Sequence, residues 1–295
     1  MTPPDDPGLL AVLAHFGVGP DAWLGSGGEA CVYAVGNDRV LRVLRRGGLT
    51  QDLIERRDLV DGLRRSASSF ALPHILEIGQ MAGRAYAVER RLPGRSALEA
   101  LRTAHGPARR RLVESYLETA AALGDLRLER HQTFGELIGP NAIATTTWSA
   151  YLVQRAAANL SRSTSEFWAI DPHHVADGLP EPTEPAFVHL DAYAGNMLAD
   201  GGTISAVLDV GDSSVAGDRR LDPLSAVVYL SAPEITPMAT SADIDLALAW
   251  LRNVGLEQWL VPARRWLAAY WSFAVDDATL HWWCRDVLIG GRRRP

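Results

Sequence analysis

The sequence predicts an α+β protein of two lobes, a small β-rich N-terminal lobe and a larger, mainly helical C-terminal lobe. Two β-hairpin patterns lie within the first 92 residues, helical apolar periods dominate from residue 107 onward, and a PGRS segment at 93–96 separates them. The chain has 295 residues, 47% of them apolar, which is enough for two lobes or one large core. We expect lobes at 1–92 and 93–295, with a hinge near 89–95.

The N-terminal lobe is predicted from strand and turn patterns. The segment WLGSGGEACVYAVGNDRVLRVLR (23–45) reads as a glycine-rich bend, a strand, a GND turn and a partner strand. Residues 49–65 have a helical period, and residues 74–92 form a second hairpin that turns at MAGR. These elements predict a small antiparallel sheet with a helix beside it.

The C-terminal lobe is predicted to be helical over 107–129, 145–163 and 240–290. One isolated hairpin, residues 188–212, interrupts it and carries polar residues among apolar ones. Its turn at DGGT brings Asn196 near Asp209, and an amide oxygen with a carboxylate suits Mg²⁺. Asp191 is then left to orient a hydroxyl group and accept its proton.

Composition narrows the class of protein. The formal net charge is −6, with all of the excess acid after residue 150, which disfavours nucleic acid as a partner. The acidic half favours a cationic ligand or a bound metal, and a solvated acidic surface explains the same count. All 29 basic residues are arginine, so lysine chemistry is excluded.

Location is predicted from what the chain lacks. No run approaches the roughly 18 apolar residues of a membrane span, and the N-terminus lacks the basic-then-apolar order of a secretory signal. The two cysteines, Cys31 and Cys284, are isolated thiols. We therefore expect a cytoplasmic protein with no membrane partner.

The glycine-rich bend GSGGEACV precedes a strand, whereas Rossmann and Walker A loops open a helix. It fits the kinase manner of covering nucleotide phosphates with backbone N–H groups. Together with this bend, HLDAYAGN (189–196) and LDVGD (208–212) resemble the HxDxxxxN and DxG/DxxD motifs of the aminoglycoside phosphotransferase family, which belongs to the protein-kinase-like superfamily. AVERRLPGRS resembles that family's hinge, and GDRRLDPLSAV resembles the segment after its metal-binding acid.

The resemblance implies a protein-kinase-like bilobal fold and an enzyme that moves the γ-phosphate of ATP or GTP to a hydroxyl of a small molecule. By resemblance, residues 1–92 bind the nucleotide and residues 93–295 hold the catalytic and acceptor sites. The implied roles are these: Asp191 is the catalytic base, Asn196 and Asp209 hold Mg²⁺, Gly25, Ser26 and Gly27 cover the phosphates, and His189 braces the loop. Asp212 is a helper near the metal or a turn residue.

Two further sets follow from the resemblance. Arg42 stands where the family has a phosphate-binding lysine, and Glu55 on the following helix is expected to pair with it. Adenine is expected on the Arg90 carbonyl and the Leu92 N–H. Ala30 replaces a third glycine that many kinases have.

The sequence leaves more than one class of acceptor molecule, and more than one function, open. An antibiotic, such as an aminoglycoside, is the first choice, and a sugar, choline, homoserine or fructosamine substrate is the alternative. A non-catalytic pseudokinase is a second alternative, motivated by Arg42, and a protein kinase is disfavoured because no Ala-Pro-Glu-like motif follows Asp209. Six tryptophans after residue 240 pack the core or stack on a ligand; Asp243, Asp245, Asp276 and Asp277 receive acceptor amines or lie on the surface.

Overall fold

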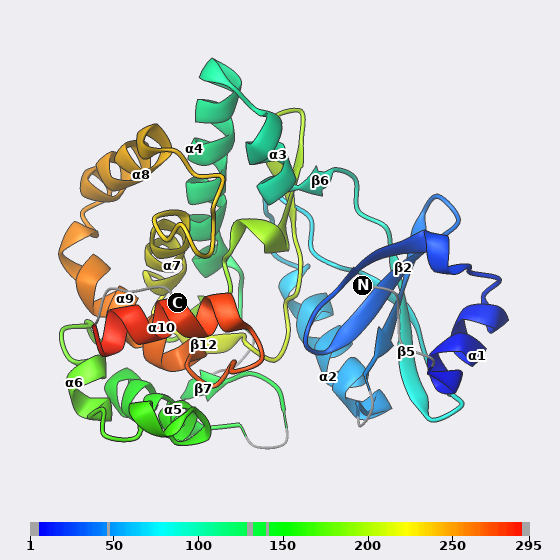
Figure 1. Cartoon of the computed structure of the whole chain (residues 1–295), viewed down its shortest axis with the longest axis horizontal. Helices are drawn as coiled ribbons and strands as arrows, with labels where there is room; N and C mark the ends of the chain where they lie inside the picture. The colour runs from blue at the N-terminus through cyan, green and yellow to red at the C-terminus, as the bar shows by residue number, and fades with distance from the viewer. Residues whose placement is uncertain (1–5, 46–47, 129–131, 140–141, 291–295) are drawn as a thin grey trace.

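The computed structural model describes residues 6–45, 48–128, 132–139 and 142–290, and these form two parts (Figure 1). The N-terminal part is a β-sheet with two helices, and the C-terminal part is mainly helical. This architecture confirms the predicted α+β class. No helix among the described residues is long and apolar enough to cross a membrane.

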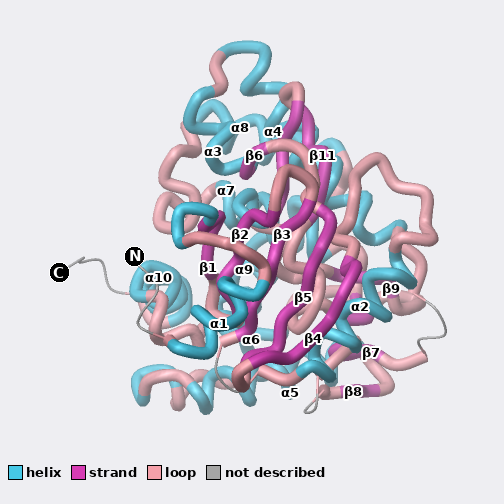
Figure 2. The backbone as a smooth tube through the Cα atoms, turned by 90° about the vertical axis from the view of Figure 1, so that its right-hand side faces the viewer, coloured by secondary structure: helices cyan, strands magenta, loops and turns pink. Residues whose placement is uncertain are grey.

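The N-terminal sheet is antiparallel, with the order β1-β2-β3-β5-β4. Figure 2 views its strands in front of the helices of the C-terminal part. The strand and helix bounds are β1 (Trp23–Ser26), β2 (Ala30–Val35), β3 (Arg39–Leu44), β4 (Ile75–Met81), β5 (Arg84–Arg90), α1 (Pro7–His15) and α2 (Thr50–Leu63). Both predicted hairpins and the predicted helix over 49–65 are therefore confirmed.

The two faces of this sheet have different partners. Tyr33, Leu41 and Val43 pack with α1, whereas Leu44 packs with Leu53 of α2. Successive side chains of a strand point to opposite faces. Arg42 therefore lies on the α2 face of β3, together with Leu44.

A short connector joins the parts. The strand β6 (Arg95–Ser96) follows it and pairs with β10 (Met197–Asp200) of the C-terminal part. Gly94 has φ of 110°, and a Cβ there would lie 2.7 Å from the carbonyl oxygen of Ala199. Glycine is needed at this position, because both the backbone angle and the close approach exclude a side chain.

The C-terminal part packs its helices around one large core that includes Tyr116, Trp148 and Trp266. Two small antiparallel sheets, β11-β10-β6 and β8-β7-β12-β9, lie among these helices. The helices are α3 (Ala97–Thr103), α4 (Gly106–Ala122), α5 (Trp148–Arg162), α6 (Pro172–Ala176), α7 (Leu221–Leu230), α8 (Ser241–Asn253), α9 (Leu260–Trp271) and α10 (Ala278–Leu288). The strands are β7 (Phe134–Glu136), β8 (Ala144–Thr145), β9 (Ala186–Val188), β11 (Thr203–Val207) and β12 (Val215–Gly217).

Candidate active site

The predicted hairpin positions Asn196 and Asp209, two of the predicted site residues. Strands β10 and β11 pair antiparallel and turn at Gly201 and Gly202, which both have positive φ. Beyond the paired strands, Leu208 N donates to the carbonyl oxygen of Asn196 at 2.7 Å. The pairing therefore brings Asn196 beside the residues that lead into Asp209, as the turn position predicts.

The segment before Asp191 is fixed by buried polar groups. The carboxylate of Asp222, on α7, accepts from the backbone N–H of His189 at 2.7 Å and from that of Leu190 at 2.9 Å. Tyr229 donates to the carbonyl oxygen of Leu190 at 3.0 Å, and Tyr116 donates to that of Ala192 at 2.7 Å. Four backbone groups around Asp191 are thus held by side chains from two helices.

The His189 side chain adds a tie between the two acidic segments. His189 is fully buried, and its Nε2 lies 2.8 Å from the carbonyl oxygen of Leu208, the residue before Asp209. Burial lowers the pKa of His189, so the ring is neutral and Nε2 carries the donated proton. This bracing role is the one that the resemblance implies.

Two residues of the site have strained backbones. Leu190 has φ of 63° and Asp209 has φ of 54°, and both values lie in the left-handed region that side chains disfavour. Such residues persist where surrounding contacts enforce them, and they gather at functional sites. Here the Asp222 and Tyr229 bonds enforce the conformation at Leu190.

Asp191 points at Asn196. The Nδ2 group of Asn196 donates to Oδ2 of Asp191 at 2.7 Å and to its backbone oxygen at 3.2 Å. Burial, and then the charge of Asp209, raise the pKa of Asp191 to about 7, against the lowering effect of the Asn196 bond. A carboxylate with this pKa is suited to exchange a proton near neutral pH.

Asp209 faces two arginines. Its Oδ1 accepts from Nη2 of Arg42 at 3.0 Å and from Nη2 of Arg56, on α2, at 3.2 Å. Burial would raise the pKa of Asp209, but the two guanidinium groups outweigh it and lower this pKa to about 2. The two guanidinium groups keep Asp209 ionised, and its side chain is 47% exposed and therefore accessible.

Arg42 differs from its expected pairing. Its Nε donates to Oε1 of Glu89 on β5 at 3.0 Å, and Glu89 is buried. The partners of Arg42 among the described residues are thus a strand acid and Asp209, and the expected pair with Glu55 is wrong. Glu55 instead accepts from Gln51 and from the backbone N–H of Gly139.

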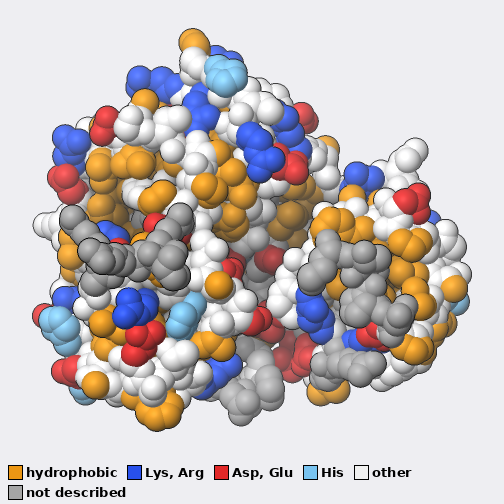
Figure 3. All heavy atoms as spheres, viewed as in Figure 1, with side chains coloured by type: hydrophobic (Ala, Val, Ile, Leu, Met, Phe, Trp, Pro, Cys, Tyr) orange, Lys and Arg blue, Asp and Glu red, His pale blue; other side chains and the backbone are white. Residues whose placement is uncertain are grey.

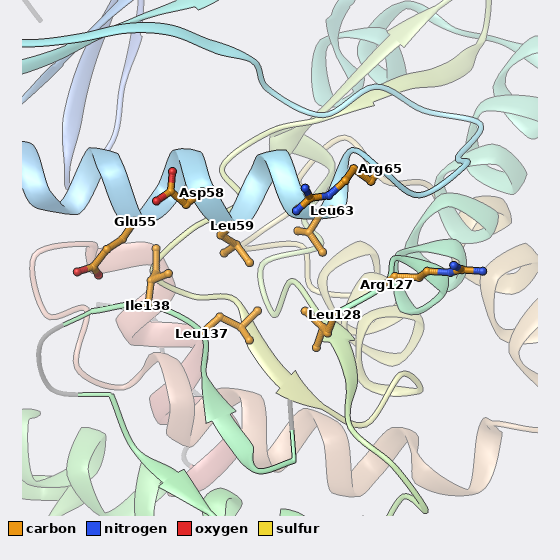
Figure 4. Close-up of a pocket in the computed structure, with 10 residues that line it drawn as sticks. Glu55, Asp58, Leu59, Leu63, Arg65, Arg127, Leu128, Leu137 and Ile138 are labelled. Carbon is orange, nitrogen blue, oxygen red and sulfur yellow. The ribbon is translucent and has the colours of Figure 1, made fainter. Parts of the chain in front are cut away.

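Glu55 lies on another face of α2. It lines a cavity of about 330 Å³, together with Leu59 and Leu63 of α2 and with Leu137 and Ile138 across from them. Figure 4 shows Glu55 leaving α2 on the side of the helix where Leu137 and Ile138 lie. The helix therefore turns Arg56, the next residue along the chain, toward Asp209.

The glycine-rich turn between β1 and β2 lies near Asp209 and its two arginines, and the space around its glycines is open. A Cβ added at Gly25, Gly27 or Gly28 would meet no atom within 4 Å. Gly27 N donates to the Ala30 carbonyl at 3.0 Å, which closes the turn between β1 and β2. Figure 3 shows a hollow between the two parts, with acidic side chains gathered along it.

Two acids, Glu29 and Asp212, lie in or beside the open glycine-rich turn. Glu29, in the turn, lies with its Oε2 4.0 Å from Nη1 of Arg56. Burial, and then the charge of Asp212, raise the pKa of Glu29, and burial also raises that of Asp212. The two carboxyl groups are close enough to interact, so Asp212 lies near the site.

The remaining predicted residues occupy distinct places. Arg90 is the last residue of β5, with its N–H bonded to the His74 carbonyl, and Leu92 follows in the connector. Ser26 ends β1, where the glycine-rich turn begins. These positions put Arg90 and Leu92 at the junction of the two parts.

The tryptophans and acids near the C-terminus mostly serve the fold. Trp266 and Trp283 are buried, and Trp271 donates to the hydroxyl of Tyr229, which in turn bonds the Leu190 carbonyl. Asp243 is buried and binds Arg109, and Asp277 caps α10. The reading of Asp243 as an acceptor of amines is therefore wrong. Asp277 is exposed and caps α10 through one carboxylate oxygen, so its reading stays a prediction.

Sequence reasoning missed three residues of this site: Arg56, Glu89 and Asp222. Asp222 had a usable signal, because it is a lone acid in the apolar run LDPLSAVVYL, every residue of which is buried. A buried carboxylate in such a run needs hydrogen-bond donors, and here these are backbone N–H groups. Glu89 and Arg56 had no comparable signal.

A protein-family model matches most of this chain. The family model described as the phosphotransferase enzyme family, APH, matches residues 24–270. No curated protein matches the chain. Several solved structures share its fold at low sequence identity.

Three of these structures illustrate the degree of similarity. The GDP complex of aminoglycoside 2'-phosphotransferase-IIIa has a TM-score of 0.62 and 14% identity over 96% of this chain and 97% of that one. ADP-bound APH(2'')-Ib has a TM-score of 0.60 and 14% identity over 91% of each chain. A candidate fructosamine-3-kinase from Haemophilus somnus 129PT has a TM-score of 0.58 and 13% identity over 95% of this chain and 96% of that one.

Proposed function

This chain belongs to the phosphotransferase enzyme family, and we propose that it transfers the γ-phosphoryl group of ATP or GTP to a hydroxyl of a small molecule. The observation that carries the proposal is the arrangement of Asp191, Asn196 and Asp209. A braced carboxylate with a pKa of about 7 stands beside an ionised one that faces two arginines. Phosphoryl transfer needs these two properties, a proton acceptor and a place for phosphate charge.

In this proposal Asp191 binds the acceptor hydroxyl, orients it and takes its proton as the bond to phosphorus forms. The Asn196 bond keeps the carboxylate in one orientation, and the Asp222, Tyr116 and Tyr229 contacts keep its backbone fixed. Fixed orientation contributes to rate because the reacting groups need no rearrangement at the moment of transfer. The bond from the γ-phosphorus to the β,γ-bridging oxygen breaks, and the nucleoside diphosphate leaves.

Residues 1–92 would form the nucleotide-binding lobe and residues 93–295 the catalytic and acceptor lobe, with the hinge near 89–95. Backbone N–H groups of Gly25, Ser26 and Gly27 would cover the phosphates, and the empty space over these glycines supports this role. Arg42 would contact phosphate through its planar guanidinium. The Arg90 carbonyl and the Leu92 N–H, at the junction of the parts, would bind adenine.

Mg²⁺ would be held by the Asn196 amide oxygen and the Asp209 carboxylate. The donor set fits, because the Asn196 hydrogen bonds use its Nδ2 group and Asp209 stays ionised. No group of three His, Cys, Asp or Glu side chains in the described ranges could hold a metal, so phosphate and water oxygens would complete the shell. When bound, Mg²⁺ would neutralise charge on the transferred phosphate.

An antibiotic is the acceptor class that we favour, because structural neighbours hold streptomycin and kanamycin. A metabolic kinase is the alternative, supported by the resemblance to a candidate fructosamine-3-kinase. The unpaired thiols Cys31 and Cys284 support a cytoplasmic location.

A panel experiment tests the proposal. Purified protein is incubated with ATP or GTP, Mg²⁺ and single acceptors: aminoglycosides, other antibiotics, sugars, choline, homoserine and fructosamines. We expect one acceptor class to cause nucleotide consumption above the rate seen without acceptor. Tight nucleotide binding with no consumption for any acceptor would instead favour the non-catalytic reading.

A further inference from the structure

We propose that Arg56 of α2 is a second cation for the nucleotide phosphates, acting beside Arg42. This inference rests on the proposed function, because it needs a nucleotide in the hollow between the two parts. It changes the charge that α2 brings to the site: the resemblance implies an acid from this helix, and the structure presents an arginine.

Arg56 lies between the two segments that would enclose the phosphates. On one side its Nη2 donates to Oδ1 of Asp209 at 3.2 Å, and on the other its Nη1 lies 4.0 Å from Oε2 of Glu29 in the glycine-rich turn. Gly211, two residues after Asp209, leaves room for the guanidinium, since a Cβ there would lie 3.3 Å from Nη1. The charged end therefore occupies the space between the phosphate-covering turn and the metal-binding acid.

Arg56 has unused hydrogen-bonding capacity. The residue is only 5% exposed, and its Nε is a buried donor with no partner among the described residues. A buried N–H of a charged group without an acceptor is costly, so an acceptor that reached this group on nucleotide binding would remove the cost. Nucleotide phosphates supply acceptor oxygens with the negative charge that a guanidinium binds best.

The two arginines share one carboxylate oxygen. Arg42 has its own acid, Glu89, on the neighbouring strand, and it shares Oδ1 of Asp209 with Arg56. One carboxylate oxygen thus accepts from two guanidinium groups, so neither is fully neutralised by it. A triphosphate placed here would give each arginine acceptors of its own.

A purely structural role for Arg56 is the rival explanation. In that case the Arg56–Asp209 pair only fastens α2 to the C-terminal part, and its loss would affect every ligand of the cleft equally. A phosphate contact would instead weaken ligands that carry phosphates and leave the nucleoside alone. The comparison of triphosphate with nucleoside therefore separates the two explanations.

The test measures binding by isothermal titration, without turnover. The ligands are a non-hydrolysable ATP analogue and adenosine, or the guanine pair if GTP binds better, each with Mg²⁺ and with EDTA. The variants are Arg56→Gln and, as matched control, Arg57→Gln, which changes the next residue of α2. Arg57 is 41% exposed and pairs with Asp58, outside the site.

We expect Arg56→Gln to weaken triphosphate binding by about tenfold to a hundredfold relative to Arg57→Gln, with adenosine binding within twofold. Arg56→Lys keeps the charge but loses the fork, so it is expected to weaken triphosphate binding several-fold; it carries the test if Arg56→Gln does not fold. Equal triphosphate affinity in all variants, or equal losses for triphosphate and nucleoside, would overturn the inference. Failure of the wild type to bind any nucleotide would instead overturn the proposed function itself.

Discussion

The segment around Asp191 and the glycine-rich turn are built in opposite ways. The segment is strained at Leu190 and held by side chains from α4 and α7, whereas the turn has glycines with nothing around them. The difference indicates a division of labour. The protein fixes the group that would accept the proton and leaves open the space that the nucleotide would fill.

Removing the proposed proton acceptor, Asp191, should give the largest effect on the reaction rate, and it tests the role of the fixed segment directly. Asp191→Asn is expected to lower kcat by about 10²–10⁴-fold, because the amide cannot accept the hydroxyl proton. Nucleotide affinity and thermal stability should stay close to wild type, as the amide fits the same space. Steady-state kinetics with the acceptor found in the panel measures this effect, and an unchanged kcat would contradict it.

Removing the support of the segment should be the next largest effect. Asp222→Ala leaves the N–H groups of His189 and Leu190 buried without acceptors, so we expect about 2–4 kcal/mol loss in the free energy of unfolding. Urea denaturation measures it. The matched control is Asp245→Ala on the exposed face of α8, which should change stability by less than about 0.5 kcal/mol. A loss as small as the control's would show that the segment does not depend on Asp222.

The pH dependence of the reaction reports on Asp191 without mutation. Its pKa is raised to about 7, chiefly by burial and then by Asp209, so the base form is lost as pH falls below this value. We expect kcat/KM to be level above about pH 8 and to fall about tenfold per unit well below pH 7, because only the ionised carboxylate accepts a proton. A level profile from about pH 5 to 9 would mean that Asp191 is not the base.

A substitution in the open glycine-rich turn should give the smallest effect. It should weaken nucleotide binding and leave stability nearly unchanged. Gly27→Ala adds a methyl group where no protein atom lies within 4 Å, so stability should change by less than about 1 kcal/mol. Nucleotide binding should weaken several-fold, because the methyl group takes space that the phosphates need. Titration and urea denaturation of this variant together test the contrast, and unaltered nucleotide affinity would show that the space over Gly27 is not used.

The sequence predicted the hairpins well because their signals are local. Alternating residues and a turn at Gly201 and Gly202 were enough to bring Asn196 toward Asp209. The motif resemblance then supplied roles for Asp191 and its neighbours. The family match supports the class of reaction, while the individual roles remain predictions.

The partners of Arg42 could not be predicted because they depend on helix phase and strand register. Glu55 and Arg56 are neighbours on α2, about 100° apart around its axis, so the orientation of the helix about that axis decides which one faces the site. Glu89 meets Arg42 diagonally across strands, since Val40 pairs with Glu89 and Arg42 with Ala87. That register is set by tertiary packing between segments that are far apart in the sequence.

The most direct test of the central claim is a balance of products. After reaction with a ³¹P-detectable nucleotide and the acceptor found in the panel, nuclear magnetic resonance and mass spectrometry quantify the products formed by the wild type and by Asp191→Asn. The account predicts one phosphorylated acceptor for each nucleoside diphosphate formed by the wild type, and almost none from the variant. Equal product from both proteins, or free phosphate with no phosphorylated acceptor, would contradict it.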